Sequence, residues 1–169
     1  MRLAILFVAP PEKDFDWDEK AVAGANRFIK RAWRVVWELT KTADASATLD
    51  PTTLDAPSAA LNRELHALGL RCTHEFDEGQ FNTAISAIME LINAVSSYLN
   101  DVAKSERLQA LCYRVASDIV AMLAPIIPHW AEELQHAALH KETPVYHEPW
   151  PIFDEAQAKS NTIEIAVQI

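Results

Sequence analysis

Glycine, cysteine and long apolar runs are scarce in this 169-residue chain, and each scarcity excludes a class of structure. Only three glycines stand against plentiful alanine and leucine, which favours helices over a strand-and-turn architecture. The two cysteines, Cys72 and Cys112, lie on apolar helical stripes and form no CxxC or zinc spacing, so we expect reduced core thiols, as in a cytoplasmic protein. No apolar run reaches the roughly 18 residues that a membrane span needs, and the short apolar start has no signal-peptide cleavage pattern.

Motifs that carry chemistry are missing as well. The sequence contains no G-x-S-x-G, no G-x-x-x-x-G-K-[ST] and no G-x-G-x-x-G, and neither cysteine has a credible nearby base. The best metal candidate places His129, Glu132, Glu133 and His136 on one helix face. Zincins require H-E-x-x-H, however, and di-metal bundles require a second Glu-x-x-His pair. We therefore predict no catalytic residue, no metal site and no cofactor within these residues.

The spacing of apolar residues predicts an all-α, antiparallel bundle of four to five helices. Its cleanest apolar stripe, from about residue 80 to 100, should lie at the centre of the bundle. A long helix capped by Asp16 or Asp18 should run to Lys41, with Gly24 interrupting it. Further helices are expected over 61–76 and 108–123 and from Pro128 onward. The apolar turn at 1–8 resembles the end of a helix, which suggests that the chain is a fragment.

The last part of the chain has a different composition. After His140 it becomes rich in proline and should be extended rather than helical. Residues 162–169 alternate apolar with polar or small side chains, which predicts one strand whose sheet partners lie outside this chain. We expect a helical domain over 1–143, followed by an extended linker and terminal strand over 144–169.

Positive charge is concentrated in one stretch of an otherwise acidic chain. The net charge is −9, yet Lys20 to Lys41 holds six basic residues and one acid, so this stretch carries +5 and the remainder −14. On a helix, five cations fall within one arc opposite the apolar face: Arg27, Lys30, Arg31, Arg34 and Lys41. Since three of them are arginines, whose planar forks suit phosphate, we predict a docking surface for an anion. The alternative is a face of solvated charge. Trp37, at the border of the arc, is either at the core edge or stacks on a base or ribose.

Short motifs in a fixed order cover nearly the whole chain. They are Arg2-Leu3 with Leu6-Phe7, Ala9-Pro10-Pro11-Glu12, Trp17, Val22, Gly24-Ala25, Arg27-Phe28, Arg31 with Trp33-Arg34, Phe81 to Ile85, Met89 to Leu91, Leu123 to Pro125, Pro128-His129, Glu132 to Leu134, Trp150-Pro151 and Asp154-Glu155. In this order and spacing they closely resemble bacterial-type leucyl-tRNA synthetase, a class I aminoacyl-tRNA synthetase. The chain departs from the family pattern at Ala21, Ala23 and Gln135.

This resemblance implies a helical anticodon-binding domain, lying between a catalytic Rossmann domain and a small C-terminal domain. The HIGH and KMSKS signatures are absent, so the fragment alone should be inactive, whereas the parent enzyme should use ATP and Mg²⁺ to couple leucine to tRNA(Leu). The expected partners are tRNA(Leu) and the other domains of the same polypeptide, in a monomeric cytoplasmic protein that contacts no membrane. A helical protein–protein interaction module is the alternative. The residues expected to bind the tRNA backbone are Arg27, Lys30, Arg31, Arg34, Trp37 and Lys41.

Overall fold

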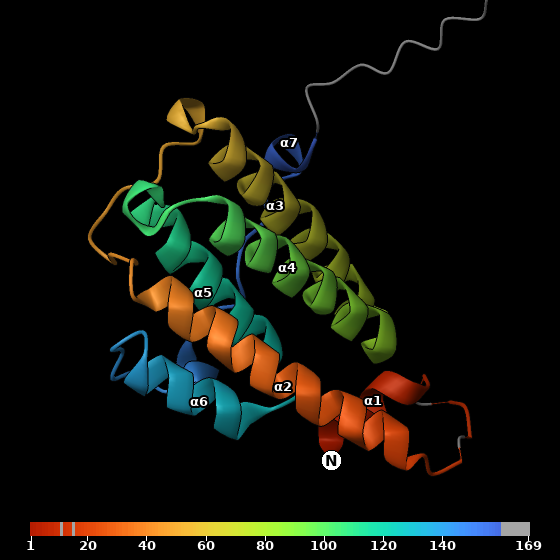
Figure 1. Ribbon diagram of the computed structural model, residues 1–169. Helices are drawn as coiled ribbons and strands as arrows, with labels where there is room; N and C mark the ends of the chain where they lie inside the picture. The colour runs from red at the N-terminus through yellow and green to blue at the C-terminus, as the bar shows by residue number, and fades with distance from the viewer. Residues whose placement is uncertain (11, 15, 160–169) are drawn as a thin grey trace, which may run out of the picture.

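The computed structural model describes residues 1–10, 12–14 and 16–159, and within these ranges every regular element is helical (Figure 1). The α-helices are α1 (Arg2–Val8), α2 (Glu19–Thr40), α3 (Ala56–Asp77), α4 (Phe81–Asp101), α5 (Gln109–Leu123), α6 (Pro128–Ala137) and α7 (Glu155–Ala158). Short 3-10 turns lie at η1 (Pro51–Thr53), η2 (Lys104–Glu106) and η3 (Val145–His147). The predicted all-α bundle is confirmed. The strand predicted over 162–169 falls outside the described residues.

Helix boundaries follow local capping chemistry. Asp18 caps α2 by accepting the Lys20 N–H at 2.8 Å, and Asp55 caps α3 by accepting the Ser58 N–H at 3.2 Å. Gly79, with φ +70°, provides the left-handed residue just beyond α3. The prediction that Gly24 interrupts the long helix is wrong, because α2 continues through it and the apolar face on either side is long enough to hold the helix together.

The core of the bundle is centred on α4, as the apolar spacing predicted. This helix contacts α1, α2, α3 and α5, and it runs antiparallel to α3 across the short turn at Gly79 (Figure 1). Its inward side chains are almost completely buried, among them Ile85, Ile88, Leu91 and Ile92. α2 lies across the outside of the bundle, packing its apolar side on α4 and α5 and leaving its other side exposed. Within the described part of the chain, no helix combines the length and apolar character that a bilayer span needs.

Residues 143–158 form a strap that runs back over the bundle to α3. The Trp150 indole N–H donates to Thr73 Oγ1 at 2.8 Å, and the Asp154 N–H donates to His66 Nδ1 at 2.9 Å. The prediction that this segment lacks helix is wrong at η3 and at α7, where the Asp154 carboxylate accepts the Ala156 N–H and caps the turn. The division of the chain at residue 143 stays a prediction.

Candidate nucleic-acid interface

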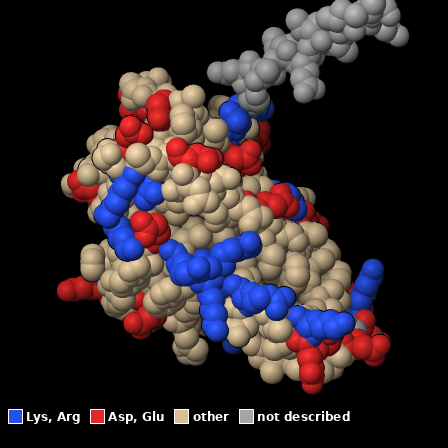
Figure 2. All heavy atoms as spheres, viewed as in Figure 1, with Lys and Arg blue, Asp and Glu red and all other residues tan. Residues whose placement is uncertain are grey.

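One side of α2 is buried and the other presents cations to solvent. Phe28, Ala32, Val36 and Leu39 are at most 4% exposed, so the helix is fixed to the bundle by its apolar side. The opposite side projects basic residues, and lysine and arginine side chains gather in a diagonal band along this helix (Figure 2). Three of the predicted residues, Arg27, Lys30 and Arg34, are exposed, and Arg31 is half-buried.

The cations of this band fall into two groups. Across the described residues, no carboxylate lies within ion-pair distance of Arg27, Lys30, Arg31 or Arg34, which we call the basic stripe. Lys41 differs, because its Nζ lies 2.6 Å from Glu38 Oε2 and donates a hydrogen bond to it. That bond, together with the charges of Lys41, Arg107 and Lys104, holds the pKa of Glu38 below its usual value. The structure therefore brings four of the predicted cations together and neutralises the fifth.

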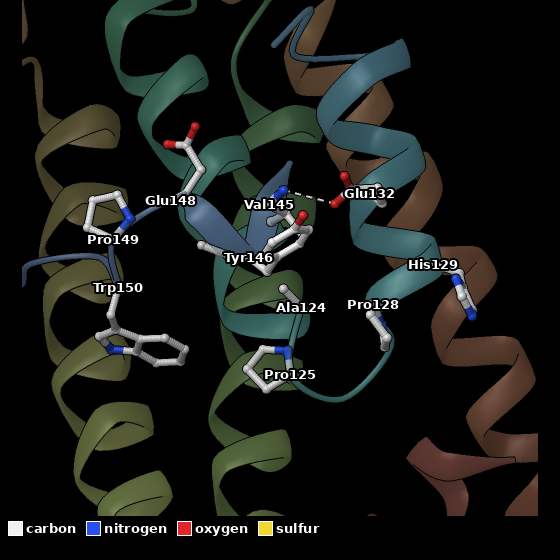
Figure 3. Close-up of a pocket in the computed structure, with 11 residues that line it drawn as sticks. Ala124, Pro125, Pro128, His129, Glu132, Val145, Tyr146, Glu148, Pro149 and Trp150 are labelled. Atoms are coloured by element: carbon white, nitrogen blue, oxygen red, sulfur yellow. Dashed lines mark hydrogen bonds between the residues drawn. The ribbon is translucent and has the colours of Figure 1, made fainter. Parts of the chain in front are cut away.

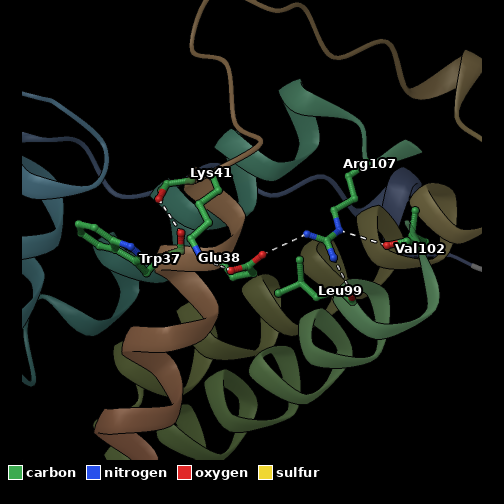
Figure 4. Close-up of polar contacts among 7 residues, drawn as sticks. Trp37, Glu38, Lys41, Leu99, Val102 and Arg107 are labelled. Carbon is green, nitrogen blue, oxygen red and sulfur yellow. Dashed lines mark hydrogen bonds and ion pairs between the residues drawn. The ribbon is translucent and has the colours of Figure 1, made fainter. Parts of the chain in front are cut away.

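Arg107 anchors the far end of this region (Figure 4). Its Nη2 donates to the Leu99 carbonyl at 2.6 Å and its Nε donates to the Val102 carbonyl at 3.2 Å, so it satisfies two acceptors at the C-terminus of α4. Its Nη1 also lies 3.6 Å from Glu38 Oε1. Sequence reasoning missed this residue, although a cation a few residues beyond a helix end is a recognisable capping signal. Arg107 is mainly structural, and it ties the end of α2 to α4.

An aromatic row borders the basic stripe. Trp37 is 39% exposed, and its ring is stacked on Trp33 with the centroids 6.3 Å apart and the planes at 9°. Trp33 in turn meets Trp130 of α6 edge-on, with the centroids 6.2 Å apart. Trp33 and Trp130 are partly buried and also pack against the core, so Trp37 is an exposed ring that stacks on a partly buried neighbour.

A groove runs between α2 and α6 next to this row. Its volume is about 760 Å³, and its apolar lining consists of Ile29, Trp33 and Trp130. The four cations of the basic stripe complete the lining, and none of the described residues around the groove is acidic. The groove therefore combines an apolar surface with a cationic border.

A second pocket has the opposite character (Figure 3). It lies between the α5–α6 corner and the strap, has a volume of about 640 Å³, and is bordered by Pro125, Pro128 and Trp150. Its described lining includes neither lysine nor arginine, and the Glu132 carboxylate at its edge accepts the Val145 N–H at 2.9 Å. With Glu132 and Glu148 in its lining, this pocket is less suited to a phosphate than the groove is.

The metal candidate on α6 does not assemble a ligand set. His136 Nε2 lies 3.8 Å from Glu132 Oε1, and the other Glu132 oxygen is engaged by the strap. Among the residues that the structure describes, no group of three or more His, Cys, Asp or Glu side chains is arranged to hold a metal ion. Both cysteines are buried free thiols, as predicted.

A comparison with protein families bears on this geometry. The family model for the anticodon-binding domain of tRNA ligase matches residues 59–169. The chain belongs to this family. The basic stripe on α2 precedes the matched range, so its assignment depends on its own geometry.

The relatives of this anticodon-binding domain agree with the motif resemblance. A leucine–tRNA ligase of Thermotoga petrophila is 35% identical over 170 residues, and one of Alcanivorax borkumensis is 40% identical over 170 residues. Each alignment covers 100% of this chain and 20% of the relative, so the chain spans about a fifth of the length of these proteins. The resemblance to leucyl-tRNA synthetases is thus confirmed, and the comparisons do not favour a protein–protein interaction module.

A solved structure shares the fold. The crystal structure of the ternary complex of the Agrobacterium radiobacter K84 LeuRS with tRNA and LeuAMS aligns with a TM-score of 0.79 and 21% sequence identity. The alignment covers 94% of this chain and 20% of that chain. The helical arrangement of this anticodon-binding domain is therefore one that a known synthetase also has.

Proposed function

We propose that the chain is the tRNA-binding helical domain of a leucine–tRNA ligase, and that it positions tRNA(Leu) by contacts to the sugar-phosphate backbone. Leucylation with ATP and Mg²⁺ belongs to the catalytic domain of the same polypeptide, and these 169 residues provide no reacting group. The parent is proposed to be a monomeric cytoplasmic enzyme with no membrane partner, in which the catalytic and C-terminal domains adjoin this one.

The observation that carries this proposal is the basic stripe. Arg27 and Arg34 are about 10 Å apart along the helix axis, since an α-helix rises about 1.5 Å per residue. Lys30 and Arg31 lie between them on the same side. Four cations at this spacing, with no acidic partner among the described residues, can contact successive phosphates, which sets the register of an RNA without reading its sequence.

The charge of the rest of the chain supports the same orientation. The segment from Lys20 to Lys41 carries +5, whereas the remainder carries −14. Because the remainder of the chain has a net negative charge, the field of the domain favours an approach of RNA toward the stripe, so the stripe directs the encounter as well as holding the complex. Within the proposed site, Lys41 contributes less than the four stripe residues because Glu38 already neutralises it. Trp37 contributes an exposed ring face on which a base or ribose of the RNA can stack.

The test is a salt titration of tRNA(Leu) binding to the chain. The logarithm of the binding constant should fall linearly with the logarithm of the salt concentration. Arg31→Ala and Arg34→Ala should each weaken binding and reduce the slope by roughly 0.7 to 0.9 for each phosphate that the variant no longer neutralises. Arg71→Ala is the matched control, because Arg71 is a surface arginine on α3 that pairs with Glu90 at 2.9 Å. An unchanged affinity and slope in both stripe variants would remove the stripe from the mechanism.

The same variants separate binding from chemistry in the full-length parent. ATP–pyrophosphate exchange needs no tRNA, so it should stay at the wild-type rate in Arg31→Ala and Arg34→Ala while tRNA charging slows. Loss of both activities would instead indicate that the substitutions damage the fold.

A further inference from the structure

The groove between α2 and α6 has a composition that backbone contacts alone do not require. Phosphate contacts need only exposed cations, yet here Ile29, Trp33 and Trp130 form an apolar surface inside the cationic border. Its volume of about 760 Å³ lies in the range of sites that hold small organic ligands. The groove therefore suits a ligand that has a flat apolar part and a negative charge close together.

Two hydrogen-bond donors at this groove lack acceptors. Arg31 Nε and Trp130 Nε1 are buried, and neither has a hydrogen-bond partner within the described residues. A buried donor without an acceptor destabilises the structure, because it has lost its hydrogen bonds to water. Both side chains line the groove, so an acceptor on a bound ligand is a partner that the described residues do not supply.

The rings of the aromatic surface pack against one another. Trp33 lies between Trp37, which is parallel to it at 9°, and Trp130, which meets it at 76°. Arg31 is held as well, since its guanidinium carbon lies 5.9 Å from the centroid of the Phe28 ring. A platform that is already ordered loses little conformational entropy when a flat ligand packs on it.

We propose that this groove binds one unstacked nucleotide of the RNA, with its base against Trp33 and Trp130 and its phosphates on the basic stripe. This inference rests on the proposed function and adds a base contact to the backbone contacts. A nucleotide joins a planar π-face and a phosphate within a single unit, which matches two indoles bordered by arginines. An acidic peptide matches the charge but not the extended aromatic surface.

The test compares two ligands with the same number of phosphates. One is a single-stranded RNA hexamer, and the other is an abasic hexamer with the same ribose-phosphate backbone. Stacking of one base contributes about 1–3 kcal/mol, so the chain should bind the intact RNA about 5- to 150-fold more tightly than the abasic one. The ratio of the two dissociation constants, measured at one salt concentration, reports the contribution of the bases, because the phosphate contacts are the same in both ligands.

Substitutions locate that contact. Ile29→Glu places a carboxylate in the groove and should bring the ratio close to 1, whereas Ile29→Met keeps the apolar lining and should preserve it. Ala23→Glu is the matched charge control, because Ala23 is exposed on the same helix and lies outside the groove. Thermal melting of each variant checks that the fold is intact. If the ratio falls to about 1 in Trp37→Leu but keeps its wild-type value in Ile29→Glu, the base stacks on Trp37 and does not bind in the groove, and the proposal is overturned.

The binding results distinguish failure of this inference from failure of the proposed function. If wild-type chain binds intact and abasic RNA equally, with a normal salt slope, the groove is not a nucleotide site and the backbone role stands. If the chain retains neither RNA, both proposals fall. If the chain binds a peptide rich in glutamate and phenylalanine more tightly than RNA, the groove is a site for a protein partner, and the proposal that it binds a nucleotide is refuted.

Discussion

Gly24 and Gly69 each lie inside a 22-residue helix, and alanine at the two positions should change stability in opposite directions. Replacing an interior helical glycine by alanine gains about 1 kcal/mol of helix propensity. At Gly24 the added Cβ would meet only the end of the Arg27 side chain, at 3.8 Å. That is an ordinary contact, so Gly24→Ala should raise the free energy of unfolding by about 0.5–1 kcal/mol.

At Gly69 the added Cβ would overlap the ring of Phe153, which packs there from the strap. The ring must move out, and with it part of the strap that Trp150 and Asp154 fasten to α3. The packing of a half-buried phenylalanine is worth about 1–2 kcal/mol, and one weakened hydrogen bond adds about 1 kcal/mol to the cost. After subtraction of the propensity gain, Gly69→Ala should lower the free energy of unfolding by about 1–2 kcal/mol.

Urea unfolding followed by tryptophan fluorescence measures both variants. A double-mutant cycle with Phe153→Ala isolates the overlap. In that background the obstacle is gone, so Gly69→Ala should become stabilising, as Gly24→Ala is in the wild-type chain. If Gly69→Ala stabilises the wild-type chain by the same amount as Gly24→Ala, then Phe153 does not sit on Gly69 and the reasoning is refuted.

Three further outcomes are expected. Arg107→Ala removes two hydrogen bonds at the end of α4 and should lower the free energy of unfolding by about 2 kcal/mol. Glu38→Gln weakens the partly exposed ion pair with Lys41 and should change the free energy of unfolding by less than about 0.5 kcal/mol. The reverse order in urea unfolding would contradict this. Burial, opposed by Arg114, raises the pKa of Asp118 to about 6. The pKa of Asp118 in the folded protein is higher than in the unfolded chain. Its protonated form therefore contributes stability at low pH, and this contribution is lost as the pH rises through about 6. In Asp118→Asn, the free energy of unfolding should therefore no longer fall for this reason between about pH 4 and about pH 7, as urea unfolding at each pH would measure. Burial also raises the pKa of the Cys72 and Cys112 thiols, to about 12 and about 11, so a thiol reagent should label both only in denaturant.

Much of the helical framework could be predicted because its signals are local. Asp18 is followed by an apolar series with helical spacing, and its carboxylate does cap α2. The series over residues 80–100 predicted a central helix, and α4 contacts four others. Gly24 misled the prediction, because the cost of one glycine is small beside the burial of the face on which α2 packs.

The candidate site was only partly predictable. Helical spacing placed Arg27, Lys30, Arg31 and Arg34 on one side, since that arrangement depends on α2 alone. It also placed Lys41 there, but could not show that Glu38 would turn toward Lys41 instead of staying open to solvent. The groove was missed, because it needs α6 to lie beside α2.

The sequence by itself determined the main helices, a cap for α2 at Asp16 or Asp18, the direction of the basic side of α2 and the resemblance to leucyl-tRNA synthetases. All of these depend on residues a few positions apart or on the order of motifs. Only the tertiary structure decided what those helices enclose. The Trp33–Trp130 pair joins residues 97 positions apart, and the strap brings Phe153 against Gly69 across 84 positions. Such pairings arise because separate apolar faces bury one another, and the spacing within each face does not specify its partner.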